Sequence, residues 1–405
     1  MSHVRSILGL FERLQSVDIS VHQDRCVLVR NRNASCMKCA EACTSACITC
    51  QDGEIAISPE RCVGCGTCAT VCPTCALEAN HPSDRDLYEA CVQVAQNADG
   101  EVAVVCEQML QAAAGRYDPD KVVGVTCLGR MEESALILLA RAGVRRVTLV
   151  RGACDGCRYH PGSETASLVV DTANALLAAW GRDGIARVAD KLPAGTRRRD
   201  DAAYDANRRG FLADMIGAAK TVAQTTADCV VEEAFGDVEI ARVGIEEGKG
   251  RREASTFQKV QEDGTLPHFL PHRRARLLQG LASFGAPDDV MVNTRLWGHV
   301  IIDIEQCSSC QMCATFCPTE AIKKFQDADG SFGVRHYPGR CVKCRCCADI
   351  CPTGALSLAD EVFAVDLHSK AYERYEMRPR ASQLGPHQMR DTVRNLLKSE
   401  FVYER

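Results

Sequence analysis

Two runs of sequence decide the fold near the carboxyl end of the chain: CSSCQMCATFCP, from Cys307 to Pro318, and CVKCRCCADICP, from Cys341 to Pro352. Both have the spacing C-x2-C-x2-C-x3-C-P. Three cysteines this close can bind three irons of one cubane only if the loop curls around it, so the fourth points away and binds the other cluster. The spacing therefore predicts two [4Fe-4S] sites, with these ligands: Cys307, Cys310, Cys313 and Cys351 for site 3, and Cys341, Cys344, Cys347 and Cys317 for site 4.

Zinc is the simplest alternative metal, but a structural zinc site usually takes its four ligands from two separated C-x2-C pairs. The two complete runs do not have that form. They closely resemble the bacterial dicluster [4Fe-4S] ferredoxin family, and this resemblance implies a ferredoxin-like (βαβ)2 domain over residues 296–360. The insert between the runs, DADGSFGVRHYPGR, is longer than in that family and predicts a hairpin turn.

A second pair of runs lies near the amino end, and it resembles the same dicluster family over residues 26–82. The run CVGCGTCATVCP is complete, whereas NASCMKCAEACTSAC has Asn33 at the position of its first cysteine and no proline after Cys43. Between the two runs, the alternating residues EIAIS predict a short strand. Because CTSACI aligns with CPTCAL, the rule of crossing ligands predicts site 2 with these ligands: Cys62, Cys65, Cys68 and Cys43.

The other amino-terminal cluster, site 1, then has Cys36, Cys39 and Cys72 and needs one more ligand. We expect Cys26 to be that ligand, with VLVRNR forming a strand that returns the chain to the cluster, since soft thiolate ligands suit these clusters and Asn33 does not. A cubane with three cysteines, or recruitment of another thiol, remains the alternative. The other thiols concerned, which we otherwise expect to be buried and free, are Cys47, Cys50 and Cys75.

The middle of the chain has an α/β pattern. EVAVVC, KVVGVTC and RRVTLV have the β-branched composition of buried parallel strands, and the segments around them have helical spacing. The order predicts a small parallel sheet covered by helices, whose ligands gather at the carboxyl ends of the strands. Four cysteines follow those strand ends, and we expect them to form a central site: Cys106, Cys127, Cys154 and Cys157.

The region from about Glu101 to Ala166, which contains CLGR and GACDGCRYHPG, is similar to the iron–sulfur delta-subunit family of methyl-viologen-reducing hydrogenase. The resemblance implies a [2Fe-2S] cluster, and electron transfer between a hydrogenase or formate dehydrogenase and a heterodisulfide-reductase-type flavoprotein. Two features differ from the family: only two residues separate Cys154 from Cys157, and a cysteine near the first strand is missing. Structural zinc, or four core thiols without metal, therefore remain alternatives for the central site.

Composition limits the protein's class. The chain has 405 residues and 26 cysteines, and its net charge of −5 does not favour nucleic acid. A disulfide scaffold would need a short secreted chain, whereas this one is long and starts with no secretory signal, so we expect a cytoplasmic, metal-binding protein. No run is apolar enough to span a membrane. Among the other cysteines, we expect Cys91 in a core, Cys229 to be incidental and Cys346 to face outward.

The predicted fold class is an α+β multidomain protein, in which two ferredoxin-like dicluster domains flank an α/β parallel-sheet domain. The predicted domains are an N-terminal helix (1–25), the first dicluster domain (26–82), the α/β iron–sulfur domain (83–190), a helical connector (191–295), the second dicluster domain (296–360) and a C-terminal extension (361–405).

Because full thiolate ligation leaves no open coordination position, and nucleotide-binding motifs are missing, the hypothesis is a non-catalytic electron-transfer subunit. It would carry four [4Fe-4S] clusters and one [2Fe-2S] cluster, with iron bound by the cysteines named above. The expected partners are subunits of a redox complex: a molybdenum or tungsten enzyme, a hydrogenase, or a flavoprotein reductase. Two alternatives stay open, a stand-alone iron–sulfur reductase with a catalytic or flavin-linked central domain, and a zinc-stabilised interaction module.

Overall fold

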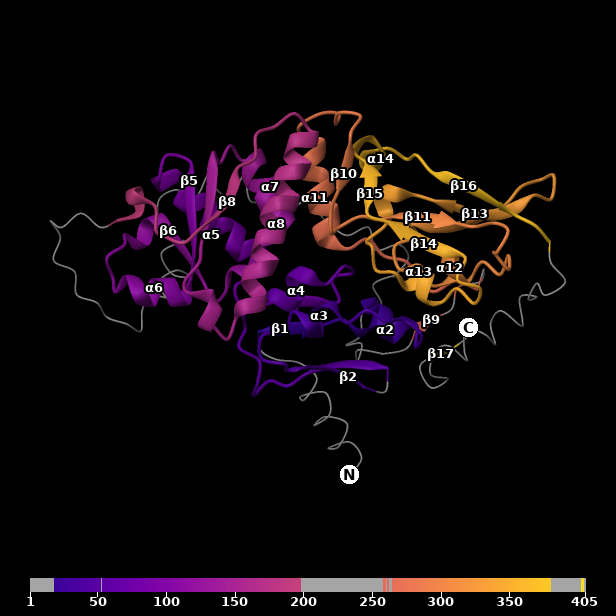
Figure 1. Ribbon diagram of the computed structural model, residues 1–405, viewed down its shortest axis with the longest axis horizontal. Helices are drawn as coiled ribbons and strands as arrows, with labels where there is room; N and C mark the ends of the chain where they lie inside the picture. Colours follow the sequence, from indigo (N-terminus) through magenta and orange to yellow (C-terminus); the bar gives the residue numbers. More distant parts are fainter. Residues whose placement is uncertain are drawn as a thin grey trace, which may run out of the picture.

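The computed structural model describes residues 18–51, 53–197 and 264–379, together with the short pieces 258–259, 261 and 402–403. Along the long axis of Figure 1, residues 84–189 form one end of the protein and residues 299–377 form the other. Residues 19–79 lie below the junction between these two ends. The predictions for residues 1–17, for most of the connector including Cys229, and for most of the last 26 residues lie outside the described residues.

The first part of the chain, module 1, consists of an outer strand pair and a hairpin. Strand β1 (Ile19–Val21) pairs antiparallel with β4 (Leu77–Ala79), and β2 (Ile48–Gln51) pairs antiparallel with β3 (Glu54–Ile57). Short helices lie between the strands: η1 (Gln23–Arg25), α2 (Val27–Arg30), α3 (Lys38–Glu41) and α4 (Thr67–Val71). The predicted strand EIAIS is therefore observed as β3.

Two local predictions for module 1 are wrong. Residues 19–21, which we assigned to an N-terminal helix, form strand β1, because Ile19 and Val21 alternate into the core against Leu77. Residues 27–30 form a helical turn instead of the expected strand. The turn buries Val27 against residues of the second half of the chain, a partner that no local pattern reveals.

The central part contains the predicted parallel sheet. Its strands are β5 (Glu101–Cys106), β6 (Val122–Val125), β7 (Arg146–Val150) and β8 (Ala186–Ala189), in the order β6-β5-β7-β8. The fourth strand was not predicted, because this edge strand is short and mostly half-buried. The covering helices are α5 (Asp84–Asn97), α6 (Glu107–Ala113), α7 (Glu133–Arg141) and α8 (His160–Ala179), and short turns η2 (Pro119–Lys121), η3 (Leu128–Arg130), η4 (Cys154–Gly156) and η5 (Ala194–Thr196) complete the region.

The strand order reverses at β5. Strand β6, which follows β5 in the sequence, pairs with one side of β5, and β7 pairs with its other side. In open parallel sheets, the carboxyl ends of strands at such a reversal border a crevice in which ligands bind. Cys106 ends β5, and Cys154 follows β7, so the topology brings them to the two sides of this reversal.

The last part of the chain, module 2, repeats the arrangement of module 1. Its outer pair is β11 (His299–Ile302) with β14 (Leu356–Ala359), and its hairpin is β12 (Ile322–Gln326) with β13 (Phe332–His336), as the insert predicted. Strand β16 (Glu373–Met377) of the C-terminal extension adds to this hairpin. Its short helices are α12 (Met312–Thr315), η7 (Pro338–Arg340), α13 (Cys346–Asp349) and α14 (Ala364–His368).

His336 at the end of β13 is fully buried, and within the part of the chain that the structure describes neither of its ring nitrogens has a hydrogen-bond partner. Its ring centre lies 5.8 Å from that of His299 on β11, and His299 in turn bonds Glu373 on β16 at 2.9 Å. Burial, with a smaller contribution from His299, lowers the pKa of His336 to about 3. His336 is therefore a neutral, desolvated imidazole at physiological pH.

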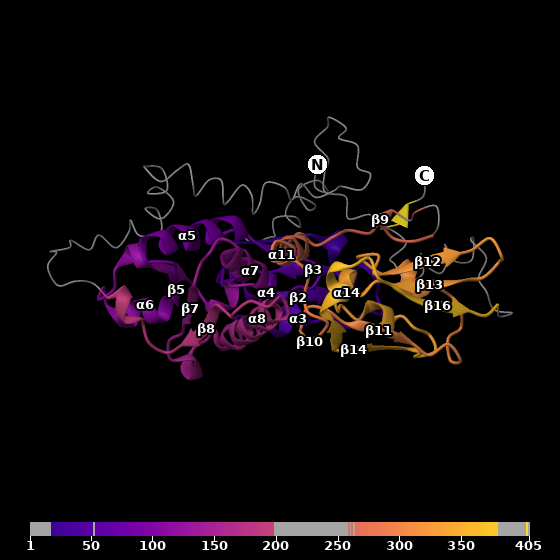
Figure 2. The same cartoon turned by 90° about the horizontal axis from the view of Figure 1, so that it is seen from above.

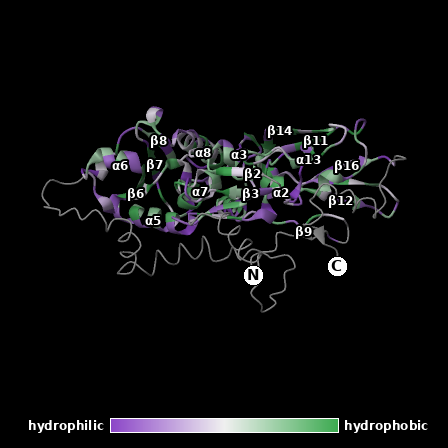
Figure 3. Cartoon of the chain, turned by 90° about the horizontal axis from the view of Figure 1, so that it is seen from below, coloured by the Kyte–Doolittle hydropathy of each residue, from purple (hydrophilic) through white to green (hydrophobic). Residues whose placement is uncertain are grey.

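Helix α11 (His272–Ala282) joins the central part to module 2. It lies within the predicted helical connector, and together with β10 (Met291–Asn293), β15 (Glu361–Phe363) and α8 it forms one hydrophobic core around Trp297. Figure 2 shows α11 between α7 and α14. In Figure 3, hydrophobic residues are seen among the central elements near α7, β2 and β3. Outside this core, β9 (Gln258–Lys259) pairs in parallel with β17 (Val402–Tyr403).

Asp84, in the first turn of α5, ties three parts of the chain together. Its carboxylate accepts hydrogen bonds from Arg130 at 2.8 Å, Arg273 at 2.9 Å and Arg276 at 2.5 Å. Arg273 also donates to the backbone oxygen of Ala69 in module 1. Although burial opposes ionisation, Arg273 and Arg130 hold the pKa of Asp84 well below its usual range.

The described helices include none that is both long and apolar enough to cross a membrane.

Candidate iron–sulfur sites

The four thiols predicted for site 1 come from separate segments that the fold brings together. Cys26 precedes α2, Cys39 lies in α3, and Cys72 follows α4. Burial raises the pKa of Cys26, and the charges of Cys72 and Cys39 raise it further. Burial and then Cys72 raise the pKa of Cys39 to about 12, and Cys72 also acts on Cys36. Cys26 is therefore an electrostatic neighbour of Cys72 and Cys39, two of the other three thiols expected at site 1.

The thiols of site 2 surround Cys68 in α4. Burial raises the pKa of Cys68, and the charges of Cys65, Cys43 and Cys62 are among those that add to this effect. Cys47 complicates the assignment, because its Sγ lies 3.5 Å from that of Cys43. The hydrogen bond from Cys47 lowers the pKa of Cys43 to about 5. Cys47 is buried, as we expect of a free thiol. It is nevertheless in contact with Cys43, which is an expected ligand of site 2.

The other two alternative ligands differ from each other. Cys75 is fully buried beside Cys72 and Arg273, and burial raises its pKa to about 12. Cys50 lies on β2 and is half-buried, and burial alone raises its pKa. Every cysteine in the described residues is a free thiol.

Module 2 groups its thiols in the same way. Burial raises the pKa of Cys313, followed by the charges of Cys310 and Cys307 of site 3. In site 4, burial and then Cys344, Cys341 and Cys317 raise the pKa of Cys347. Cys351, the crossing ligand assigned to site 3, packs against the core that contains Cys307 and Cys313.

The prediction that Cys346 faces outward is wrong. Cys346 is fully buried at the start of α13, where Asn31 of module 1 donates a hydrogen bond to its Sγ at 3.7 Å. It is covered because module 1 packs on this face of module 2. Cys91, in contrast, is buried in the core of the central part, as predicted.

A hydroxyl group accompanies each crossing cysteine, and the sequence analysis missed this feature. In all four cases the hydroxyl belongs to the second residue after the cysteine and lies 3.6 to 4.0 Å from its sulfur: Ser45 beside Cys43, Thr74 beside Cys72, Thr319 beside Cys317 and Thr353 beside Cys351. The signal was visible as C-x-[ST] in each run. The shared contact gives Cys43 the same local surroundings as the other three crossing cysteines.

Backbone amides also point at these sulfurs. Ala76 N donates to Cys72 Sγ at 3.2 Å, and Cys47 N donates to Cys43 Sγ at 3.4 Å, in each case from the fourth residue after the cysteine. Such donors stabilise a thiolate, and around a bound cluster they tune its reduction potential. The local geometry of these turns therefore suits an anionic sulfur ligand.

The central site gathers at the strand reversal. Gly152 N donates to Cys106 Sγ at 3.2 Å, and Tyr159 N donates to Cys157 Sγ at 3.4 Å. Cys154 and Cys157 act electrostatically on Cys106, and burial raises the pKa of Cys127 to about 12, with further contributions from neighbouring thiols. A Cβ atom at Gly162 would collide with Cys127 Sγ, so only glycine allows α8 to approach this closely.

Soft thiolate donors suit iron–sulfur clusters, and each of the five predicted sets has four cysteines. Among the described residues, no three His, Cys, Asp or Glu side chains are arranged to hold a single metal ion.

The two modules meet at a basic side chain. Lys38 of α3 donates a hydrogen bond from Nζ to the backbone oxygen of Lys343 at 3.3 Å. The charges of Cys36 in site 1 and Cys344 in site 4 act electrostatically on its ammonium group. Nearby, the amide and the hydroxyl of Ser35 both donate to Asp349. Sites 1 and 4 are thus on either side of a polar contact between the modules.

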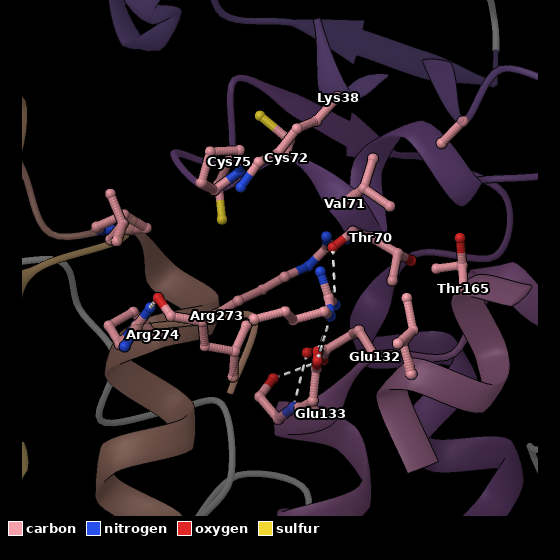
Figure 4. A pocket seen from close by; sticks show the side chains of 18 of the residues that line it. Lys38, Thr70, Val71, Cys72, Cys75, Glu132, Glu133, Thr165, Arg273 and Arg274 are labelled. Atoms are coloured by element: carbon pink, nitrogen blue, oxygen red, sulfur yellow. Dashed lines mark hydrogen bonds and ion pairs between the residues drawn. The ribbon is translucent and has the colours of Figure 1, made fainter. Parts of the chain in front are cut away.

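A cavity of about 340 Å³ opens at this junction. Figure 4 shows Cys72 and Cys75 on one side of it, Arg273 and Arg274 on the α11 side, and Glu133 below. Glu133 is held by Arg295, with both contacts at 2.6 Å. The walls of this cavity are therefore charged.

Two family models match parts of the chain. One is described as a 4Fe-4S dicluster domain and matches residues 306–355, and the other is described as a 4Fe-4S binding domain and matches residues 55–78. No curated protein and no solved structure matches the chain. The chain thus carries two ferredoxin-type domains that bind [4Fe-4S] clusters, with the binding runs of sites 2, 3 and 4 inside the matched residues. The run from Asn33 to Cys47 and the central region lie outside both matches.

Proposed function

We propose that this chain is an electron-transfer subunit with four [4Fe-4S] clusters and one [2Fe-2S] cluster, in two ferredoxin-like dicluster domains and a central α/β domain. When bound, such clusters accept and release single electrons. The chain's own contribution is to hold them through thiolates, to exclude water from most of them, and to set their order in space.

The observation that carries the proposal is that neighbouring thiol sets interact electrostatically, either directly or through a lysine that lies near both sets. The charge of Cys65 in site 2 acts electrostatically on Cys127 of the central site. In the same way, the charge of Cys39 in site 1 acts on Cys68 of site 2. Lys38 lies between Cys36 of site 1 and Cys344 of site 4. Within module 2, Cys347 of site 4 feels the charge of Cys313 in site 3. The proposed order is central site, site 2, site 1, site 4, site 3.

The two ends of this series suit contacts with other proteins. The turn that contains Cys154 and Cys157 has exposed residues on both sides, and Cys351 at the other end is half-buried. We infer that partner subunits dock at these ends. From the resemblance of residues 101–166, we expect the partners to be a hydrogenase, a molybdenum or tungsten enzyme, or a flavoprotein reductase.

Anaerobically prepared protein tests the cluster content. The assignment predicts about 18 iron atoms per chain, mostly in cubanes, by iron analysis and Mössbauer spectroscopy. Iron near zero, or iron without a cubane signature, would refute the proposal.

The series is tested by reoxidation of the reduced protein with a slow acceptor. Wild-type clusters should reoxidise together, because electrons redistribute along the series. A Cys39→Ala variant, which interrupts site 1, should reoxidise in two separate phases, whereas Cys91→Ala should behave as wild type. A single phase in Cys39→Ala would contradict the proposed order.

A further inference from the structure

The turn after Cys43 differs from the other three turns of its kind at one buried side chain. In each of these turns, the fourth residue after the crossing cysteine is buried, with between 1% and 4% of its surface exposed. The four residues are Cys47 after Cys43, Ala76 after Cys72, Ala321 after Cys317 and Ala355 after Cys351. Site 2 therefore has a thiol where each of the other three sites has only a methyl group.

The four turns have a similar backbone, so the difference lies in this side chain. The residue before the buried position has a positive φ in every turn: 48° at Ala46, 50° at Cys75, 55° at Glu320 and 66° at Gly354. The amides of Cys47 and Ala76 both donate to the sulfur of their crossing cysteine, at 3.4 and 3.2 Å. Because alanine satisfies this position in three turns, packing alone does not require the cysteine in the fourth.

The thiol of Cys47 lies against two expected ligands of site 2. Its Sγ is 3.5 Å from the Sγ of Cys43, and it also hydrogen-bonds Cys62. The sulfurs of a disulfide are about 2.05 Å apart, so those of Cys43 and Cys47 need to approach by about 1.5 Å. Since both residues belong to one turn, side-chain rotation can supply this approach without moving another segment of the chain.

The sulfurs of Cys43 and Cys47 differ in their access to solvent. Cys43 is half-buried, and the residues that follow it up to Ala46 are half-buried or exposed, whereas Cys47 is only 4% exposed. A small oxidant that arrives from solvent should therefore meet Cys43 first. An accessible thiol next to a second, resolving cysteine is the arrangement of cysteines that undergo reversible oxidation.

We propose that Cys43 and Cys47 form a reversible disulfide under a peroxide, and that this bond protects Cys43 and interrupts the electron-transfer series at site 2. The inference rests on the proposed function, in which site 2 connects the central site to site 1. While Cys43 is held in the disulfide, site 2 lacks one of its four ligands. Reduction by a dithiol breaks the bond by exchange and returns both thiols, so the interruption is reversible.

The oxidant in this reaction is a peroxide, and the atoms and electrons balance. The thiolate of Cys43, when it is not bound to iron, attacks one oxygen of hydrogen peroxide, so that an S–O bond forms, the O–O bond breaks and hydroxide leaves. Cys47 then attacks the same sulfur, the S–S bond forms and the S–O bond breaks, and the proton of Cys47 leaves with the oxygen as water. The two sulfurs lose two electrons, and the peroxide accepts them.

The test exposes iron-loaded protein to excess hydrogen peroxide, blocks the remaining thiols with an alkylating reagent under denaturing conditions, and maps the cysteines by tandem mass spectrometry. In wild type, the tryptic peptide of residues 39–61 should contain a disulfide between Cys43 and Cys47, with Cys50 alkylated. Treatment with a dithiol should remove this disulfide. In Cys47→Ala, about tenfold more of Cys43 should become sulfinic or sulfonic acid, because no second thiol traps the first oxidation product.

The other turns supply matched controls. Cys47→Ala gives site 2 the residue that the other three turns have, so this variant should bind the wild-type amount of iron before oxidation. Ala355→Cys makes the opposite change beside Cys351, which is half-buried like Cys43. This variant should gain a disulfide at Cys351 under the same treatment, whereas wild type should form none there.

The inference is overturned if oxidised wild type has both Cys43 and Cys47 alkylated, or if Cys47 is linked to a different cysteine. It is also overturned if Cys43 is oxidised to the same extent in wild type and in Cys47→Ala. Any of these results, in protein with a full complement of iron before oxidation, leaves the proposed electron-transfer function intact. Iron near zero before oxidation refutes that function, whatever the disulfide map shows.

Discussion

Replacing Asp84 by asparagine should loosen the contact that holds α11 against the central part and module 1. The side chain of Asp84 is 12% exposed, and those of its partners Arg130, Arg273 and Arg276 are 2%, 9% and 6% exposed. Asparagine keeps the shape and one acceptor oxygen, but it removes the single negative charge shared by three buried guanidinium groups.

The size of the effect follows from this burial. Removing one partner of a buried ion pair costs about 3–5 kcal/mol, because it leaves an uncompensated charge. Since asparagine still accepts a hydrogen bond, we expect the lower end, about 3 kcal/mol. A change of this size is roughly a 100-fold increase in the equilibrium constant for local opening, at 1.4 kcal/mol per factor of ten.

Amide hydrogen exchange of the iron-loaded protein measures local opening without global unfolding. In Asp84→Asn, exchange in α11 should be about 100-fold faster than in wild type. The matched control is Arg85→Ala on the next residue of α5, whose ion pair with Glu89 is exposed (48% and 40%) and should contribute at most about 1 kcal/mol. If α11 exchanges no faster in Asp84→Asn than in Arg85→Ala, the carboxylate does not hold this junction together.

Three further predictions concern individual side chains. Cys26→Ala should lose site 1 and about four iron atoms per chain, while Cys91→Ala, which removes a buried thiol assigned to no site, should keep them all; equal iron content in both would reject Cys26 as a ligand. His336 has its pKa lowered to about 3 by burial and by His299, so the unfolded chain binds a proton below about pH 6.5 that the folded chain does not. The stability of module 2 should therefore fall as the pH drops from 7.5 to 5.5, by about 1.4 kcal/mol, and His336→Leu should flatten this dependence in hydrogen exchange of β13; an unchanged slope would contradict it. Thr74→Val removes a hydroxyl 3.7 Å from Cys72 Sγ and should lower the potential of site 1 by roughly 40 mV, from about 1 kcal/mol per hydrogen bond; a titration without a shift would show that the contact has no electrostatic effect.

The sequence by itself predicted features that depend on local spacing. The four-cysteine runs assign sets of ligands because a short loop can wrap only one cluster, and this rule led to Cys26 as a candidate ten residues from its nearest partner. The hairpin of module 2 and the first three strands of the parallel sheet were also predicted, because hydrophobic period and turn residues are local properties. The hydroxyl beside each crossing cysteine was visible in the sequence, but its significance appeared only when all four contacts could be compared.

Contacts between distant segments were decided by the tertiary structure alone. Val27–Arg30 is a helical turn rather than a strand, and Cys346 is buried rather than exposed, because modules 1 and 2 pack against each other across more than 300 residues of chain. The same packing buries Arg30 and half-buries Lys38. A sequence records the charge of a side chain, but the solvent that screens it and the groups that face it are known only once the chain has folded.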